Sequence, residues 1–194
     1  QINFSKQFVF MKSQDLIILE NLKLGDSSAY KELFDLYYMP LSIYSLKYCD
    51  SFDLAEDIVQ DLFIKFWDEK IYINLETAIS PYLFKAVKNN SLQAAKKKNK
   101  YVFEEIEDQV NLLMEEEHLD LDLLELEKKK LYAEIELLPL KSKEVFKAIV
   151  LNNLKYKEVA LEMGISVNTV KTHYSRALKQ LRGSLDTIVM LLLV

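Results

Sequence analysis

The sequence predicts an all-α protein of two small helical domains joined by a flexible acidic linker. Only three glycines and three prolines occur in 194 residues, and strand-rich folds need many more of these turn-forming residues. Half of the residues are hydrophobic, enough for a packed core. Apolar residues recur at helical spacing in residues 11–98 and 124–185, and residues 99–123 between them are polar and acidic.

The charge is divided unevenly between these parts. The formal net charge is −5, yet residues 104–127 hold eleven acidic residues and no Lys or Arg. Without that stretch the chain carries 25 basic and 19 acidic residues, a balance of +6. Residues 128–183 hold twelve Lys or Arg against five acids. The acidic average therefore hides a basic C-terminal block, which suits nucleic-acid binding.

Composition also limits the compartment and the chemistry. Cys49 is the only cysteine, so no internal disulfide is expected, as in the reducing cytoplasm. We find no signal peptide, and the longest apolar run, residues 188–194, is far shorter than the roughly 20 residues of a membrane span. No nucleophile–base pair, metal-ligand cluster or phosphate-binding glycine loop is found. We therefore expect no membrane insertion, enzyme activity, cofactor or metal site. Residues 1–10 are interpreted as an upstream extension or an expression remnant.

Two helices are expected early in the N-terminal block. The stretch DSSAYKELFDLYY predicts a core helix that Asp26 or Ser27 caps. Residues 53–70 predict a helix with two neighbouring apolar stripes, wider than one core contact needs. Either both stripes are buried, or this helix docks a partner helix. Carboxylates and an amide edge the stripes: Asp57, Gln60 and Asp61.

A basic helix is expected over residues 80–98, after a loop at residues 70–80. Ser80 is its predicted cap, and Pro81 suits its first position. This helix is either a solvated lysine face or a surface for phosphates and bases. The residues that share its polar side are Lys85, Lys88, Asn89, Gln93, Lys96 and Lys97.

The stretch KEVALEMGISVNTVKTHYSRALKQLR, residues 157–182, predicts a helix-turn-helix. Gly164 supplies the positive φ of its turn, and Ser166 or Asn168 caps its second helix. The residues expected to pack inward are Val170, Tyr174, Ala177, Leu178 and Leu181. The opposite face offers Asn168, Thr169, Lys171, Thr172, Ser175, Arg176 and Lys179.

This polar face begins with short hydrogen-bonding groups and continues with cations. That order suits a recognition helix whose first part meets base edges while cations bind phosphates. The alternative is a helical hairpin with a solvated polar face. His173 is expected either to contact DNA or to lie half-packed at the rim.

Together, in this order and spacing, these motifs resemble an extracytoplasmic-function (ECF) sigma factor of the sigma-70 family over roughly residues 15–185. GD-x-x-A-Y-x-x-L-F resembles the start of region 2, and D-x-x-Q-D-x-F-x-x-x-W, residues 57–67, resembles region 2.2. Residues 82–98 resemble region 2.4, and LPLKSKEVF with the helix-turn-helix resembles region 4. The resemblance implies a σ2-like domain at residues 11–98, a linker at 99–123, a σ4-like domain at 124–185 and a tail at 186–194.

The resemblance implies a promoter-specificity subunit of bacterial RNA polymerase. Its partners would be the core enzyme, through the β′ clamp coiled coil and the β-flap, and promoter DNA. An anti-sigma factor often holds the two domains of such proteins in an inactive pose and is a further candidate partner. The polymerase-binding residues implied are Asp57, Gln60, Asp61, Phe63 and Trp67. Those implied for the −10 element are Lys85, Lys88, Asn89, Gln93 and Lys96, with residues 70–79 as the site for a flipped base. Those implied for the −35 element are Ser166, Asn168, Thr169, Lys171, Thr172, His173 and Arg176.

The chain departs from the family pattern in region 2.4. Gln93-Ala94 stands where many members have Asp or Asn followed by an aromatic residue, and Lys96 stands where they have Arg. Lysine cannot make the planar two-pronged contact of arginine, so the base sequence that the chain prefers at the −10 element is left open. The run DTIVMLLLV resembles the hydrophobic tails of Bacteroidetes members. It either covers part of region 4 or meets a regulator.

Two further alternatives remain at this point. The acids of the linker, Glu115, Glu116 and Glu117 among them, either occupy a basic channel of the polymerase until RNA displaces them, or fold back on the basic domain.

A helix-turn-helix activator or repressor that never enters the polymerase is the rival function. Such a regulator would have no use for the patch at residues 57–67.

Overall fold

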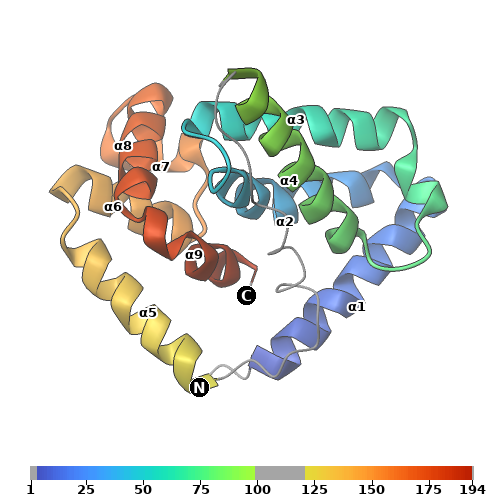
Figure 1. Cartoon of the computed structure of the whole chain (residues 1–194), viewed down its shortest axis with the longest axis horizontal. Helices are drawn as coiled ribbons and strands as arrows, with labels where there is room; N and C mark the ends of the chain where they lie inside the picture. The colour runs from blue at the N-terminus through green and yellow to red at the C-terminus, as the bar shows by residue number, and fades with distance from the viewer. Residues whose placement is uncertain (1–3, 99–120, 194) are drawn as a thin grey trace. The chain divides into compact units, whose positions relative to one another are not determined.

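A computed structural model describes residues 4–98 and 121–193, and both stretches contain helices and no strand (Figure 1). The predicted all-α class is confirmed for this part of the chain. The described residues divide into two compact units, one over residues 4–98 and one over residues 121–192. Most of the predicted linker, including Glu115, Glu116 and Glu117, lies outside the described residues.

The first unit is built around its second helix. Its elements are α1 (Phe4–Lys23), α2 (Ser27–Ser45), α3 (Phe52–Asp68), the 3-10 helix η1 (Ile71–Asn74) and α4 (Ile79–Lys98). Helix α2 contacts α1, α3 and α4, and α3 also contacts α4 and η1. Large side chains from each helix meet in the core, among them Ile18, Tyr37, Leu41, Phe66 and Leu83.

Local signals set the starts of α2 and α3. Asp26 caps α2 by accepting the Ser28 N–H at 2.8 Å, which confirms one of the two predicted caps. Ser51 caps α3 by accepting the Leu54 N–H at 3.4 Å. Each side chain satisfies a backbone donor that the first helical turn leaves without an intrahelical partner.

The start of α4 differs from the prediction. The helix begins at Ile79, so Ser80 lies inside it and Pro81 is its third residue. The Ser80 N–H and hydroxyl both donate to Asp15 of α1. A carboxylate 65 residues away in sequence therefore satisfies the backbone group that a local cap would have satisfied.

The second unit places α8 against two other helices. Its elements are α5 (Leu121–Glu136), α6 (Leu140–Val150), α7 (Tyr156–Met163), α8 (Val167–Gln180), the 3-10 helix η3 (Arg182–Ser184) and α9 (Leu185–Leu192). Helix α8 contacts α6 and α7. Helix α5 ends at Glu136, and Pro139 occupies the N-cap position of α6 without a side-chain hydrogen bond.

The apolar tail forms α9 and packs on its own unit. Leu185, Ile188 and Val189 are buried, and α9 contacts α5 and α6. The Ser184 hydroxyl donates to Glu134 Oε2 at 2.7 Å and ties the start of α9 to α5. Of the two roles predicted for the hydrophobic tail, the structure supports the one in which the tail covers part of its own domain. No helix within residues 4–98 and 121–193 has both the length and the apolar character of a membrane span.

Candidate functional site

The turn before α8 has the predicted geometry. Gly164 closes α7 with φ of +63°, in the left-handed region that glycine adopts readily. The Ile165 N–H then donates to the Ala160 carbonyl at 3.0 Å. Ser166 caps α8 by accepting the Thr169 N–H at 3.1 Å. The prediction of Gly164 as the turn residue is confirmed, and Ser166 is the cap of the two proposed.

The apolar face of α8 is buried as predicted. Tyr174 stacks on Phe146 of α6 with ring centroids 6.1 Å apart and meets Tyr156 of α7 edge-on at 6.0 Å. This packing fixes the rotation of α8 about its axis and so decides which residues face outward. The buried residues of α8 and its C-cap are Val170, Tyr174, Ala177, Leu178 and Leu181.

The outward face of α8 carries the residues predicted for the −35 element. Asn168, Thr172 and Arg176 are exposed and lie one turn apart. The Thr172 hydroxyl donates to the Asn168 carbonyl at 2.9 Å and keeps lone pairs for a further donor. Thr169 is half-buried, and its hydroxyl pairs with that of Ser166 at 2.9 Å. The half-buried Lys171 lies over the Tyr156 ring, 5.5 Å from its centroid.

His173 lies at the rim of this face. Its Nδ1 is 3.4 Å from the hydroxyl of Ser142, a buried residue of α6, and its ring is half-buried. Of the two predicted positions, the structure favours the half-packed one. This contact joins α8 to α6 close to the exposed surface.

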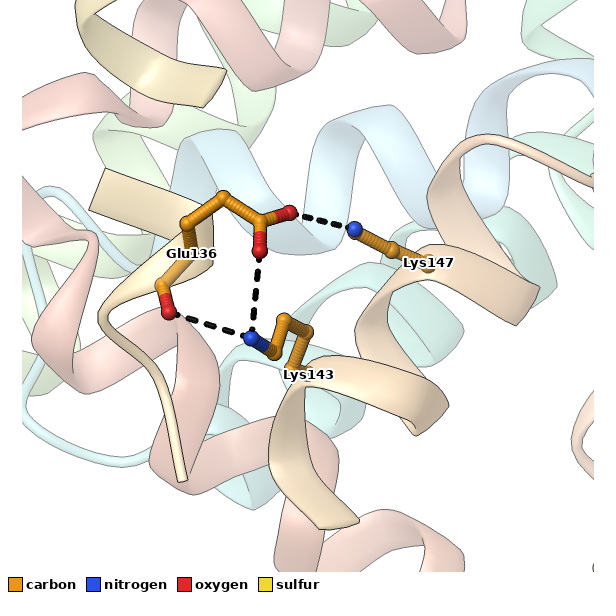
Figure 2. A network of polar contacts seen from close by, with 3 residues as sticks. All are labelled: Glu136, Lys143 and Lys147. Carbon is orange, nitrogen blue, oxygen red and sulfur yellow. Dashed lines mark hydrogen bonds and ion pairs between the residues drawn. The ribbon is translucent and has the colours of Figure 1, made fainter. Parts of the chain in front are cut away.

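A separate ionic network joins α5 to α6, as Figure 2 shows. Glu136 accepts from Lys147 Nζ at 2.6 Å and from Lys143 Nζ at 3.2 Å, and Lys143 also reaches the Glu136 carbonyl at 3.1 Å. Hydrogen bonds from Lys147 and Lys143 lower the pKa of Glu136. Two of the cations that make the second unit basic are therefore partly neutralised within it.

The two apolar stripes of α3 are largely buried. Phe63 is 1% exposed and lies 5.0 Å from the Phe34 ring of α2, centroid to centroid. Trp67 is half-buried and lies 4.7 Å from the Tyr30 ring. The interpretation of Phe63 as a partner-contacting side chain is wrong for this structure, because α2 covers it. Phe63 can act on a partner only by holding α3 in place.

The exposed face of α3 is polar with one apolar residue. Asp57, Gln60 and Asp61 are exposed, as expected. Ile64 is 57% exposed and lies four residues after Gln60, one turn along the same face. The sequence did contain a signal for Ile64, because it falls outside both buried stripes. An apolar contact edged by carboxylates is therefore available on this helix.

Gln60 is held by a network that begins in the core. Its Nε2 donates to the Tyr38 hydroxyl at 3.0 Å, and that hydroxyl donates to Glu56 Oε1 at 3.1 Å. Glu56 is 2% exposed. Burial raises the pKa of Tyr38, and the nearby charge of Glu56 raises it further, while the Gln60 hydrogen bond opposes the rise. Tyr38 is therefore a neutral phenol with a proton to donate at neutral pH.

The polar side of α4 is divided by burial. The predicted residues Lys85, Asn89, Gln93 and Lys96 are exposed. Lys88 is only 6% exposed, so the prediction that it contacts DNA is not met in this structure. It lies three residues before the buried Ser91, on the inner side of the helix. Helical spacing alone did not separate it from its exposed neighbours.

Helix α1 fixes the loop that leads into α4. Asp15 Oδ2 accepts from the Ser80 N–H at 2.9 Å and from the Ser80 hydroxyl at 3.0 Å, while Tyr37 donates to Oδ1 at 3.2 Å. Burial raises the pKa of Asp15, and these hydrogen bonds oppose the rise. At the other end of the loop, Lys23 donates to the Leu75 carbonyl. The second half of the region predicted to take a flipped base, residues 75–79, is therefore tied to α1 at Leu75 and next to its end at Ser80.

Comparisons with known proteins identify the second unit. Residues 128–181 match the family model described as sigma-70, region 4, and they contain the helix-turn-helix of α7 and α8. The predicted resemblance to the sigma-70 family is thereby confirmed for this part of the chain, which is a sigma-70 region 4 domain. Sigma factors are not enzymes, in agreement with the expectation from the sequence.

Two solved structures resemble the chain over most of its length. One is CnrH in complex with the cytosolic domain of CnrY, with 18% identity, 89% of this chain and 97% of that chain covered, and a TM-score of 0.40. The other is the sigma factor RpoE in complex with the anti-sigma factor NepR from Bartonella quintana, with 20% identity, coverages of 81% and 96%, and a TM-score of 0.33. None of the curated proteins matches the chain. These findings do not support the Bacteroidetes lineage predicted from the tail.

Proposed function

We propose that this chain is an ECF sigma factor that binds core RNA polymerase and directs it to promoters with defined −10 and −35 elements. The observation that carries the proposal is the sigma-70 region 4 domain, in which α8 buries its apolar face and exposes Asn168, Thr172 and Arg176. A helix held in this way offers hydrogen-bonding groups to base edges and a cation to a phosphate. The −35 element is the proposed ligand of this face.

The proposed polymerase contact is the exposed face of α3. Asp57 and Asp61 offer negative charge, Gln60 offers an amide, and Ile64 offers an apolar contact. A partner helix with cations around an apolar residue is complementary to this face. The β′ clamp coiled coil implied by the family resemblance is the proposed partner. Phe63 and Trp67 support this surface from beneath.

The proposed −10 contact combines α4 with the loop before it. Lys85 and Lys96 are exposed cations, and Asn89 and Gln93 are exposed amides on the same helix. Cations bind the phosphates of an opened strand, while amides can hydrogen-bond to its bases. Residues 70–79 are the proposed place for a flipped base, and α1 holds their second half at Leu75 and Ser80. Lys88 would contribute by shaping the helix surface.

Run-off transcription with core polymerase over a promoter library tests this function directly. We expect transcripts from a subset of promoters that share two elements about two helical turns apart. Asn168→Ala should change the preferred −35 bases and leave polymerase binding intact. Gln60→Ala should weaken polymerase binding and leave binding of the −35 duplex intact. A chain that binds duplex DNA but never associates with core polymerase would instead be the rival helix-turn-helix regulator.

The place of action and a further partner follow from this function. A sigma factor acts where polymerase and DNA are found, which is the bacterial cytoplasm. An anti-sigma factor is a candidate partner because the family resemblance implies it. Co-purification of the chain from cells before and after stress would show whether a regulator holds it apart from core polymerase.

A further inference from the structure

A hydrogen-bonded path leads from the core of the first unit to the proposed polymerase surface. Glu56 of α3 is buried and Gln60 of α3 is exposed, and the hydroxyl of Tyr38, a half-buried residue of α2, contacts both. The distances along the path are 3.1 Å from the Tyr38 hydroxyl to Glu56 and 3.0 Å from Gln60 Nε2 to the Tyr38 hydroxyl. Both contacts lie within the range of ordinary hydrogen bonds.

The direction of each hydrogen bond follows from the chemistry of the buried end. The Tyr38 hydroxyl donates its only proton to Glu56 Oε1, because a carboxylate oxygen accepts. The Tyr38 oxygen must then accept, and only the NH₂ end of the Gln60 amide can donate to it. The amide is thereby oriented, with its carbonyl oxygen and its second N–H left for a partner.

From this path, and resting on the function proposed above, we propose that Tyr38 is a positioning residue for polymerase binding. Through Glu56 and Tyr38 the core selects one orientation of the Gln60 amide. That orientation presents an acceptor on the face that also carries the exposed carboxylates Asp57 and Asp61, and it favours a partner side chain that donates, such as Arg or Lys. Without the Tyr38 hydroxyl, binding would have to immobilise Gln60 by itself, which weakens association.

The test is a set of binding measurements with core polymerase on the full chain. The variants are Tyr38→Phe, Gln60→Ala and the double variant. Tyr38→Phe removes only the hydroxyl, because the ring still stacks on Phe34, 4.7 Å away. We expect Tyr38→Phe to weaken binding about two- to tenfold. Adding it to Gln60→Ala should change binding no further, because coupled residues are not additive.

Tyr48→Phe is the matched control. It also removes one phenol hydroxyl from a half-buried tyrosine, and that hydroxyl donates to the Tyr44 hydroxyl at 3.1 Å. We expect binding by this variant to equal that of the unchanged chain. A loss equal to that of Tyr38→Phe would show a general effect of removing such hydroxyls and would overturn the proposal.

A second readout does not depend on folding stability. The side-chain NH₂ resonances of Gln60, identified by their absence in Gln60→Ala, should move toward those of a free glutamine in Tyr38→Phe. Unchanged resonances would overturn the proposal, as would additive losses in the double variant. If Gln60→Ala weakens binding and Tyr38→Phe does not, the positioning role fails and the proposed function stands. If Gln60→Ala has no effect, both the role of Gln60 and that of Tyr38 fail.

Discussion

The two units hold their exposed candidate faces in different ways. In the first unit, buried polar groups reach toward the surface: Glu56 holds Gln60 through Tyr38, and Asp15 holds the start of α4. In the second unit, α8 is held by its apolar face and by a local cap, Ser166. The exposed residues of α8 therefore depend little on one another's side chains for their position.

This difference predicts how each unit tolerates change. A buried hydrogen-bond network is directional, and losing one member leaves its partner unsatisfied at a cost. Apolar packing depends on shape and does not involve the outward side chains. We therefore expect the outward residues of α8 to be exchangeable for new DNA specificity. The face of α3 and the loop before α4 should tolerate fewer substitutions, because their supports lie inside the core.

Loss of the apolar anchor of α8 has the largest expected effect. Phe146 is fully buried and stacks on Tyr174. Phe146→Ala should lower the free energy of unfolding of the second unit by about 3–5 kcal/mol, because it opens a cavity beneath the helix. Amide hydrogen exchange in α6 and α8 would measure the loss. Slow exchange retained throughout α8 would contradict the view that this apolar face is the main support of the helix.

Loss of the polar anchor of α4 should come next. Asp15→Ala leaves the Ser80 N–H and the Tyr37 hydroxyl without their acceptor in the core, at a cost of about 1–3 kcal/mol of unfolding free energy. Chemical denaturation followed by circular dichroism would measure it. The backbone amides in the first turn of α4 should lose their protection from hydrogen exchange at the same time. An unaltered midpoint would mean that water replaces the carboxylate without cost.

The same carboxylate predicts a pH dependence that can be checked with Asp15→Asn. Burial raises the pKa of Asp15 above its ordinary value of 3.8, so the folded chain binds this proton more tightly than the unfolded chain. Its contribution to stability is therefore fully present below pH 3.8 and declines as the pH rises through the raised pKa. The unfolding free energy of the unchanged chain, minus that of Asp15→Asn, should fall over that interval. A constant difference would show that the hydrogen bonds cancel the effect of burial.

A smaller effect is expected at the turn of the helix-turn-helix. A Cβ added at Gly164 meets no atom within 4 Å, so the φ of +63° is the only source of strain. Gly164→Ala should therefore cost about 1–2 kcal/mol. The thermal midpoint of the second unit would report it, and Gly183→Ala, which is also sterically free and has no positive φ, is the matched control. Equal thermal midpoints for the two variants would show that the positive φ of Gly164 does not make alanine more costly there than at Gly183.

The smallest effect is expected at the ionic network of Figure 2. Glu136→Gln removes an exposed carboxylate that is paired with Lys143 and Lys147, and such surface pairs contribute little to stability. The thermal midpoint should scarcely move, while the second unit becomes more basic and its DNA affinity rises slightly at low salt. A marked loss of stability would show that this exposed network contributes as much to the free energy of unfolding as the buried hydrogen bonds of the first unit.

Much of the second unit could be predicted from the sequence. Gly164, Ser166 and the buried stripe of α8 follow from spacing within about 25 residues, and local backbone geometry determines them. The first unit was harder, because its decisive contacts join distant residues. The pairing of Asp15 with Ser80 spans 65 positions and has no local signature. Ile64 could have been found by tracing which residue of α3 lies outside both apolar stripes.

The sequence by itself determined the helices, the turn of the helix-turn-helix and the residues that share each helix face, because these depend on near neighbours along the chain. Only the tertiary structure decided which faces stay open. Helix α2 covers Phe63, and Lys88 lies on the inner side of α4, although both were predicted to contact partners. Helical periodicity states which side chains point the same way. It cannot state how many neighbouring helices cover that side, because burial depends on the packing of segments far apart in the chain.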